Sequence, residues 1–259
     1  MAQSSIKVLL PIFPGFNTLD LNGPAEVLGN TALPPKIFSI TVTSATELTT
    51  SYENVTIKRD ISFSELRTSK SKLAEYDVLI QPGAAQYAID AVLDSSDGGG
   101  GLLELIKIFS ELEKASCDRW LISICTGAHF LGAVGAFSGK MATTHWRALE
   151  KLKQVCAKYA QKQGAKDADV VRKRWVDGGH NAKGVRIASS GGISCGIDCT
   201  LWFLSERVGM KEAVTVATAM DYDWKFAKID VTQGALVQWK GEIVERNERV
   251  ENQDLNVAS

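Results

Sequence analysis

The sequence lacks the features that direct a protein to nucleic acid or into a membrane. Its 29 basic and 30 acidic residues leave a net charge of −1 over 259 residues, without the positive excess that binds phosphate backbones or anionic lipids. No apolar run reaches the roughly 20 residues that span a bilayer, and the start, MAQSSIKVLLPIF, has no secretory signal pattern. We therefore expect a cytoplasmic protein whose partners are small molecules or a second copy of itself.

Cysteine and histidine are also scarce. The five cysteines contain no CxxC pair, and only three histidines are present, so neither a disulfide framework nor a zinc site is indicated. We expect no metal and no cofactor. A free cysteine is usually a small apolar core residue, and one with another role must therefore stand out by its sequence context.

Short apolar runs alternate along the chain with helical segments. The runs are IKVLLPIF, IFSITVTS, YDVLIQPG and RWLISIC, in a chain that is 45% hydrophobic. Strands that are apolar on both faces and alternate with helices indicate an α/β fold with a mostly parallel sheet covered on both sides, a three-layer sandwich. We expect one domain over residues 1–239 and a polar tail over residues 240–259.

Two glycine-containing stretches predict loops. DSSDGGGG at residues 94–101 indicates a flexible linker between a strand and its helix. DGGHNAKG at residues 177–184 lies between the strand-like runs DVVRKRWVD and GVRIASS. It predicts a hairpin turn, with His180 exposed to solvent.

Cys125 stands where the apolar run RWLISI passes directly into the helical segment TGAHFLGAVGAF. A strand followed at once by a helix places the thiol on a sharp turn at the carboxyl edge of the sheet. The helix dipole and the free N–H groups at that position favour a thiolate, which is the nucleophilic form of cysteine. Cys125 is therefore the candidate nucleophile.

Three other segments are predicted to reach the same edge. QPGAAQ follows the strand YDVLI, so N–H groups around Gly83 and Ala84, with that of Thr126, are placed to stabilise developing negative charge. FPGFNTLD supplies Asp20, and MATTHW supplies His145. The local sequence leaves two alternatives open: Asp20 as a helix cap, and His145 as a helix-start residue satisfied by the backbone.

Taken together and in order, the segments FPGFNTLDLNGPAEVL, QPGAAQ, SICTGAHFLGAVGAFSGKMATTHW and SSGGISCGID resemble the ThiJ/PfpI superfamily. The resemblance covers residues 6 to about 222 and implies a flavodoxin-like, class I glutamine amidotransferase-like fold. It also implies a homodimer. Within the superfamily the chain resembles the isonitrile hydratase branch, which carries aspartate where other branches carry glutamate.

The resemblance assigns the site residues. It implies Cys125 as the nucleophile, Asp20 facing it, Thr126 and Gly83 beside it, and His145 nearby. Ala84 stands where the family has a second glycine, which keeps the N–H group but narrows the pocket.

The implied reaction is hydration of an isonitrile to an N-substituted formamide through a Cys125 thioimidate. Asp20 would have to hold a proton near neutral pH, which requires a pKa raised by burial or by the adjacent thiolate. One alternative is a cofactor-independent glyoxalase that acts on methylglyoxal-like aldehydes and uses His145 as proton shuttle. Another is a redox sensor in which Cys125 is oxidised to a sulfinate.

Overall fold

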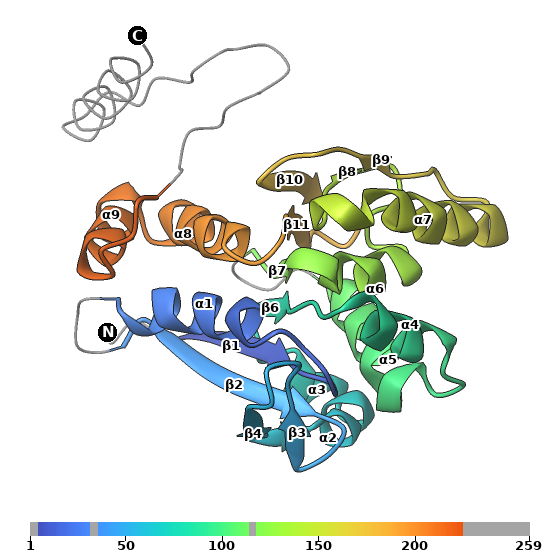
Figure 1. The fold of residues 1–259 in the computed structure, drawn as a ribbon, viewed down its shortest axis with the longest axis horizontal. Coiled ribbons are helices and arrows are strands. Elements are labelled where there is room, and N and C mark those ends of the chain that lie inside the picture. The colour runs from blue at the N-terminus through green and yellow to red at the C-terminus, as the bar shows by residue number, and fades with distance from the viewer. Residues whose placement is uncertain (1–4, 32–35, 114–117, 225–259) are drawn as a thin grey trace, which may run out of the picture. The chain divides into compact units, whose positions relative to one another are not determined.

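A seven-stranded sheet organises the chain. The computed structural model describes residues 5–31, 36–113 and 118–224. The strand order is β10-β11-β7-β6-β1-β2-β5, and all neighbours are parallel except β10 and β11 (Figure 1). The strands are β1 (Ile6–Pro11), β2 (Phe38–Ser44), β5 (Ile61–Ser62), β6 (Val78–Gln81), β7 (Trp120–Ser123), β10 (Trp175–His180) and β11 (Arg186–Ser190).

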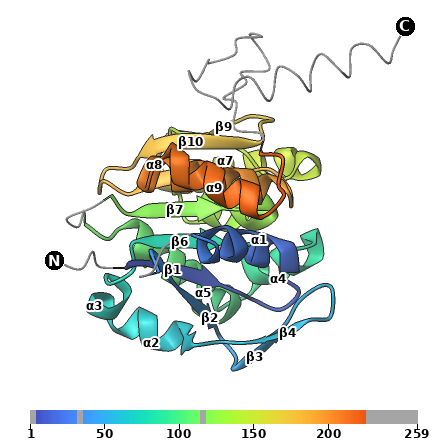
Figure 2. The same cartoon turned by 90° about the vertical axis from the view of Figure 1, so that its left-hand side faces the viewer.

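Helices cover both faces of this sheet. On one side lie α1, α8 and α9, and on the other lie α4, α5, α6 and α7 (Figures 1 and 2). The α-helices are α1 (Thr18–Gly29), α2 (Phe63–Thr68), α3 (Lys70–Leu73), α4 (Gln86–Asp94), α5 (Gly98–Ser110), α6 (Ala128–Ala133), α7 (Leu149–Gln163), α8 (Cys195–Arg207) and α9 (Met210–Ala219). The predicted α/β fold with a mostly parallel central sheet is confirmed.

Four short strands form two further pairs. An antiparallel hairpin joins β3 (Leu48–Thr50) to β4 (Thr56–Lys58), and a parallel pair joins β8 (Met141–Ala142) to β9 (Asp169–Val170). Two 3₁₀ turns, η1 (Cys125–Gly127) and η2 (Trp146–Ala148), precede α6 and α7. The hairpin and η1 both contribute to the site described below.

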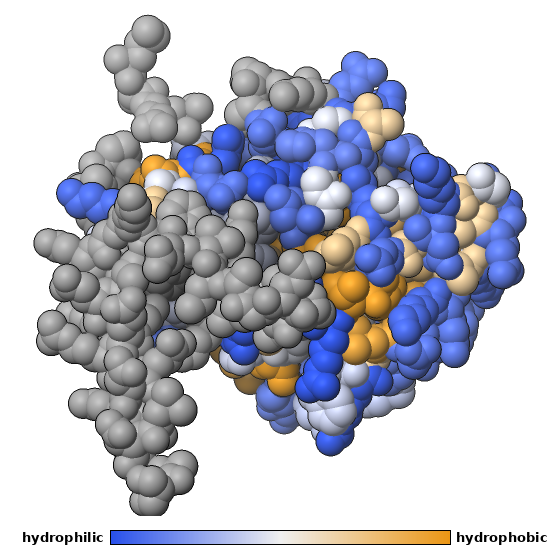
Figure 3. Space-filling model, turned by 90° about the horizontal axis from the view of Figure 1, so that it is seen from above, coloured by the Kyte–Doolittle hydropathy of each residue, from blue (hydrophilic) through white to orange (hydrophobic). Residues whose placement is uncertain are grey.

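The central strands form the core because their side chains are apolar on both faces. Val78, Leu79 and Leu121 are fully buried, as expected for parallel strands between two helix layers. Trp120 packs edge-on against Trp202 of α8, with ring centroids 5.5 Å apart. The surface is mostly hydrophilic on the face shown in Figure 3, where a smaller apolar area lies among polar side chains.

The prediction for DSSDGGGG is wrong in its position. The stretch joins helix α4, which ends at Asp94, to helix α5, which begins at Gly98. The strand-to-helix junction comes earlier, because α4 starts at Gln86, shortly after β6. Gly98 to Gly101 all have positive φ, from 61° to 94°, a conformation that glycine adopts without a steric cost.

The predicted hairpin is present, but its turn is shorter than expected. β10 extends through His180, so this histidine lies in a strand, with its Nε2 3.7 Å from Asp118 Oδ2. Asn181 makes the turn, because its Oδ1 accepts hydrogen bonds from the N–H groups of Lys183 and Val185 at 2.9 and 3.0 Å. DVVRKRWVD also forms two strands, β9 and β10, where one was expected.

The expected domain boundary at residue 239 and the tail over 240–259 lie outside the described residues. Within the described part of the chain, no helix combines the length and apolar character needed to cross a membrane. The same residues contain no cluster of three His, Cys, Asp or Glu side chains that is placed to hold a metal ion.

Substituting Leu121→Ala tests the central strand. Leu121 is fully buried in β7, so the change should lower the free energy of unfolding by about 2–5 kcal/mol. Leu48→Ala is the matched control, since Leu48 is 59% exposed in β3 and its loss should cost less than about 0.5 kcal/mol. Urea unfolding measures both, and equal losses would contradict this packing.

Candidate active site

Cys125 lies on the predicted turn between β7 and the helical segment. It is the first residue of η1, and its φ of 55° places a residue other than glycine in the left-handed region. Such a conformation costs about 1–3 kcal/mol and persists only where surrounding contacts enforce it. The predicted strained turn is therefore confirmed.

The loop after β6 packs directly on this turn. A Cβ atom at Gly127 would lie 2.5 Å from the Gln81 carbonyl oxygen, and one at Gly83 would lie 2.6 Å from the Thr126 nitrogen. Both positions therefore require glycine. The hydroxyl of Thr126 completes the contact, because it accepts the N–H of Ala84 at 2.8 Å and donates to the Ala84 carbonyl oxygen at 2.6 Å.

Asp20 lies in the first turn of α1 and faces this junction. The helix cap is Asn17, whose side chain accepts the N–H groups of Leu19 and Asp20, so the alternative in which Asp20 is merely the cap is wrong. The Asp20 carboxylate is completely buried and accepts the N–H of Gly83 at 3.0 Å. The Cys125 thiol is near enough to interact with this carboxylate and lower its pKa, whereas Oδ1 of Asp20 has no hydrogen-bond partner among the described residues.

Burial changes the acidity of this pair. It raises the pKa of Asp20 to about 7, and the hydrogen bond from Gly83 and the interaction with Cys125 only partly oppose it. Burial, followed by the charge of Asp20, raises the pKa of Cys125 to about 12. The site therefore holds a single negative charge shared by the two groups above neutral pH.

The raised pKa of Cys125 contradicts the expectation that the helix start alone would favour a thiolate. The thiol is only 6% exposed, and desolvation outweighs the favourable backbone interactions. The backbone N–H groups of Thr126 and Ile193 interact with Cys125 and lower its pKa. Ile193 was not identified from sequence, although it lies in the glycine-rich segment SSGGISCG and has a φ of 36°.

Of the three expected oxyanion donors, Gly83 and Ala84 are not free, whereas Thr126 acts on Cys125. The N–H of Gly83 donates to Asp20, and the N–H of Ala84 donates to the Thr126 hydroxyl. These two residues therefore position other side chains in the structure, and the prediction that their N–H groups point toward the reacting atoms is wrong. The donors that act on Cys125 are the N–H groups of Thr126 and Ile193.

His145 starts the helical segment that contains η2. Its Nδ1 accepts the N–H of Arg147 at 3.3 Å, and its ring stacks on Trp146 with centroids 5.8 Å apart. A Cβ atom at Gly192 would lie 2.0 Å from the ring, so His145 packs against the loop that carries Ile193. The histidine thus fits the helix-start alternative and reaches the site only through that loop.

The other two histidines, and Cys156, Cys195 and Cys199, lie outside this centre. His129 is buried, with Nδ1 2.7 Å from the Thr126 carbonyl oxygen, which is typical of a structural role. Burial raises the pKa values of Cys156 and Cys199. Cys195 is half-buried, and Cys117 lies outside the described residues.

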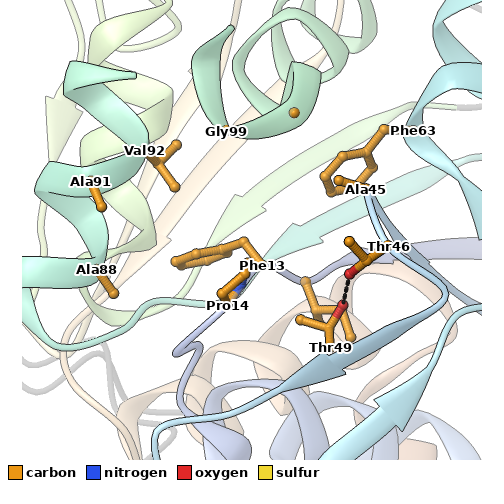
Figure 4. A pocket seen from close by; sticks show the side chains of 12 residues that line it. Phe13, Pro14, Ala45, Thr46, Thr49, Phe63, Ala88, Ala91, Val92 and Gly99 are labelled. Carbon is orange, nitrogen blue, oxygen red and sulfur yellow. Dashed lines mark hydrogen bonds between the residues drawn. The ribbon is translucent and has the colours of Figure 1, made fainter. Parts of the chain in front are cut away.

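A separate apolar cavity lies near the site without including Cys125 or Asp20. Its volume is about 280 Å³, and Phe13, Phe63 and Val92 form its walls together with the glycine segment that begins α5 (Figure 4). Thr46 and Thr49 supply hydroxyl groups, which are hydrogen-bonded to each other at 3.3 Å. Because these walls hold no titratable group, we place the chemistry at Asp20 and Cys125.

The fold and the site together define an α/β protein with a cysteine on a strained strand-to-helix turn and a buried carboxyl group beside it. The family model described as "DJ-1/PfpI family" matches residues 6–179. The chain belongs to the DJ-1/PfpI family.

Individual relatives are distant. The isonitrile hydratase of Pseudomonas putida is 27% identical over 219 residues, which cover 84% of this chain and 79% of that protein. A ThiJ/PfpI family protein from Pseudomonas syringae aligns with a TM-score of 0.64 at 19% identity, over 85% of this chain and 76% of the other. Oxidised DJ-1 of Toxoplasma gondii aligns with a TM-score of 0.61 at 16% identity, over 85% and 100% of the two chains.

Substituting Asp20→Asn tests the raised pKa of the carboxyl group. The unfolded chain ionises Asp20 near pH 3.9, whereas the folded protein keeps the proton until about pH 7. The folded state binds more protons in this window, so the free energy of unfolding of wild type falls as pH rises, by on the order of 4 kcal/mol. Asp20→Asn removes this dependence, so its free energy of unfolding should rise relative to that of wild type as the pH increases from 4 to 7.

Urea unfolding across this pH range measures the difference between the two proteins. Asp94→Asn, which removes an exposed carboxylate, is the control and should follow wild type. A difference between wild type and Asp20→Asn that stays constant from pH 4 to pH 7 would show that the Asp20 pKa is not raised.

Proposed function

We propose that the protein hydrates a small isonitrile to the N-substituted formamide, with Cys125 as nucleophile and Asp20 as proton donor. The observation that carries the proposal is the buried, interacting pair of Asp20 and Cys125, in which burial raises the pKa of Asp20 to about 7. An isonitrile carbon becomes electrophilic when it gains a proton, so the reaction needs an acid and a thiolate beside the same atom. The similarity to an isonitrile hydratase supports the same choice.

The first step uses the form of the pair that holds one proton. Transfer of that proton from the Cys125 sulfur to the Asp20 carboxylate creates a thiolate beside an acid, and the N–H groups of Thr126 and Ile193 stabilise the sulfur. Asp20 then protonates the terminal carbon of the isonitrile while the sulfur attacks that carbon. A C–S bond forms, and the products are a thioimidate and an ionised Asp20.

Hydrolysis returns the pair to its starting state. The oxygen of a water molecule adds to the thioimidate carbon, and Asp20 passes a proton of that water to the nitrogen. The C–S bond then breaks, sulfur leaves as the thiolate, and the hydroxyl proton returns to Asp20. One isonitrile and one water give one N-substituted formamide.

The alternatives use the same cysteine. A glyoxalase needs His145 to move protons, but Nδ1 of His145 accepts the Arg147 N–H, and its ring stacks on Trp146. A redox sensor would use the same Cys125 thiolate, but it gives no role to the proton that the neighbouring Asp20 takes up and releases near pH 7. The site geometry therefore favours Asp20 as the partner of Cys125 and hydration as the reaction.

An activity panel on wild type, Cys125→Ala and Asp20→Asn tests the proposal. We expect turnover of an isonitrile by wild type and at least about a 100-fold loss in kcat/KM in each variant, since one removes the nucleophile and the other the proton donor. Cys156→Ala is the control, because Cys156 lies on α7 away from the pair, and it should stay close to wild type.

Two results would redirect the assignment. Turnover of methylglyoxal without turnover of an isonitrile would establish the glyoxalase alternative. Absence of both activities, with Cys125 the first cysteine oxidised by peroxide, would favour the sensor.

The expected homodimer stays a prediction that rests on the resemblance. Leu19, next to Asp20 in sequence, and Ile193 are apolar residues that are 43% and 38% exposed. Burying such surface in a second copy is favourable. Light scattering at micromolar concentration should give twice the mass of the chain, and a monomer mass would contradict the prediction.

A further inference from the structure

The β3–β4 hairpin is fastened to the segment that leads into α1. The N–H of Gly15 donates to the Thr50 carbonyl oxygen, and the N–H of Tyr52 donates to the Phe16 carbonyl oxygen, both at 2.9 Å. Two backbone hydrogen bonds thus hold the turn of the hairpin over the start of the helix that carries Asp20. Glu53 lies in this turn.

The carboxylate of Glu53 binds the first residues of α1. Its Oε1 accepts the Nδ2 hydrogen of Asn17 at 2.7 Å, and its Oε2 accepts the N–H of Thr18 at 2.9 Å and the Thr18 hydroxyl. The same Asn17 carboxamide accepts the N–H of Asp20 at 3.1 Å through Oδ1. The Asn17 side chain therefore links the Glu53 carboxylate to the backbone of Asp20.

The position of Glu53 has an electrostatic consequence. Free N–H groups and the dipole at a helix start stabilise a nearby ionised carboxylate. At the start of α1 they would therefore favour loss of the proton from Asp20. Glu53 occupies the N–H of Thr18 and adds a negative charge that raises the pKa of Asp20. Burial opposes ionisation of Glu53 itself, but hydrogen bonds from Thr18 outweigh it and lower the pKa of Glu53, so Glu53 is charged at neutral pH.

The groups that face Asp20 come from several elements. Gly83, in the loop after β6, donates its N–H, and Cys125, at the strand-to-helix turn, contributes the thiol; both interactions lower the pKa of Asp20. The charge of Asp20 also raises the pKa of Cys195, at the start of α8. Among the interactions with named groups that act on Asp20, the charge of Glu53 is the one that favours the protonated form.

We propose that Glu53 is a positioning residue for the Asp20–Cys125 pair, which orders the first turn of α1 and, through its negative charge, keeps the proton of the pair in place near neutral pH. Glu53 acts through Asp20 and does not touch the reacting atoms. The inference rests on the proposed function only in that loss of this first proton produces the one-proton form of the pair that reacts with the isonitrile.

Substituting Glu53→Gln tests the inference, because it keeps a side-chain oxygen for Thr18 and removes the charge. The readout is the rate at which iodoacetamide alkylates Cys125 as a function of pH, measured on the full chain by mass spectrometry without substrate. In Glu53→Gln the Asp20–Cys125 pair should lose its first proton at lower pH than in wild type. The midpoint of the pH dependence of the alkylation rate should therefore shift down by about half a pH unit. Where the isonitrile is turned over, the acid limb of kcat/KM should shift in the same direction.

Two further variants separate the local charge from other effects. Glu47→Gln removes an exposed carboxylate just before β3 that pairs with Lys58, and it should leave the midpoint at the wild-type value. Glu53→Asp keeps the charge and should stay closer to wild type than Glu53→Gln. An unchanged midpoint in Glu53→Gln, or equal shifts in Glu53→Gln and Glu47→Gln, would overturn the inference.

A salt series on wild type gives a test that needs no substitution. Glu53 is exposed, so raising the salt concentration to about 1 M, where the Debye length is about 3 Å, screens its charge. The alkylation midpoint should then move down in wild type and stay nearly constant in Glu53→Gln. A wild-type midpoint that does not move with salt would count against the inference even if Glu53→Gln fails to fold. Because alkylation needs no turnover, the result stands apart from the outcome of the activity panel.

Discussion

The close approach of the loop after β6 to the turn after β7 is the constraint on which the site depends. Gly127 lies against the carbonyl oxygens of Gln81 and Pro82, where no Cβ atom fits. This contact lets the Thr126 hydroxyl bond both backbone groups of Ala84. It also leaves the N–H of Gly83 directed at Asp20. One contact between the ends of β6 and β7 therefore positions the carboxyl group of Asp20, which follows the end of β1.

The same packing explains the acidity of the site. Excluding water from Asp20 and Cys125 raises both pKa values, because a buried charge loses its hydration. A lone buried thiol would then be unreactive. Beside a carboxylate whose pKa is raised to about 7, and which therefore accepts a proton more readily than an ordinary carboxylate, the thiol can instead transfer its proton locally, and the strained turn at Cys125 keeps the sulfur next to its partner.

The fold is that of the DJ-1/PfpI family, whereas contacts of individual side chains determine the surroundings of Asp20. The chain belongs to the DJ-1/PfpI family, is 27% identical to the isonitrile hydratase of Pseudomonas putida, and shares its fold with solved structures of family members. Glu53 belongs to a short hairpin outside the central sheet, and its hydrogen bonds with Asn17 and Thr18 reach the first turn of the helix that carries the buried acid. A surface segment is thus bonded to the element that positions Asp20 without being part of the sheet.

The sequence by itself determined the alternation of strands and helices and the place of Cys125 at a strand-to-helix junction. Both are local properties, since apolar runs and their order along the chain decide which segments become buried parallel strands. The convergence of Asp20 with Cys125 also followed, because strand ends of one parallel sheet meet at the same edge.

Only the tertiary structure decided which partner each polar group takes. Gly83 and Ala84 were predicted as free donors, yet their N–H groups are held by Asp20 and Thr126, and the contacts of Ile193 and Glu53 with the site were not foreseen. These contacts join residues far apart in the chain, and their geometry depends on how closely the loops pack. The pKa values belong here too, because desolvation is a property of the folded surroundings and not of a residue or its neighbours in sequence.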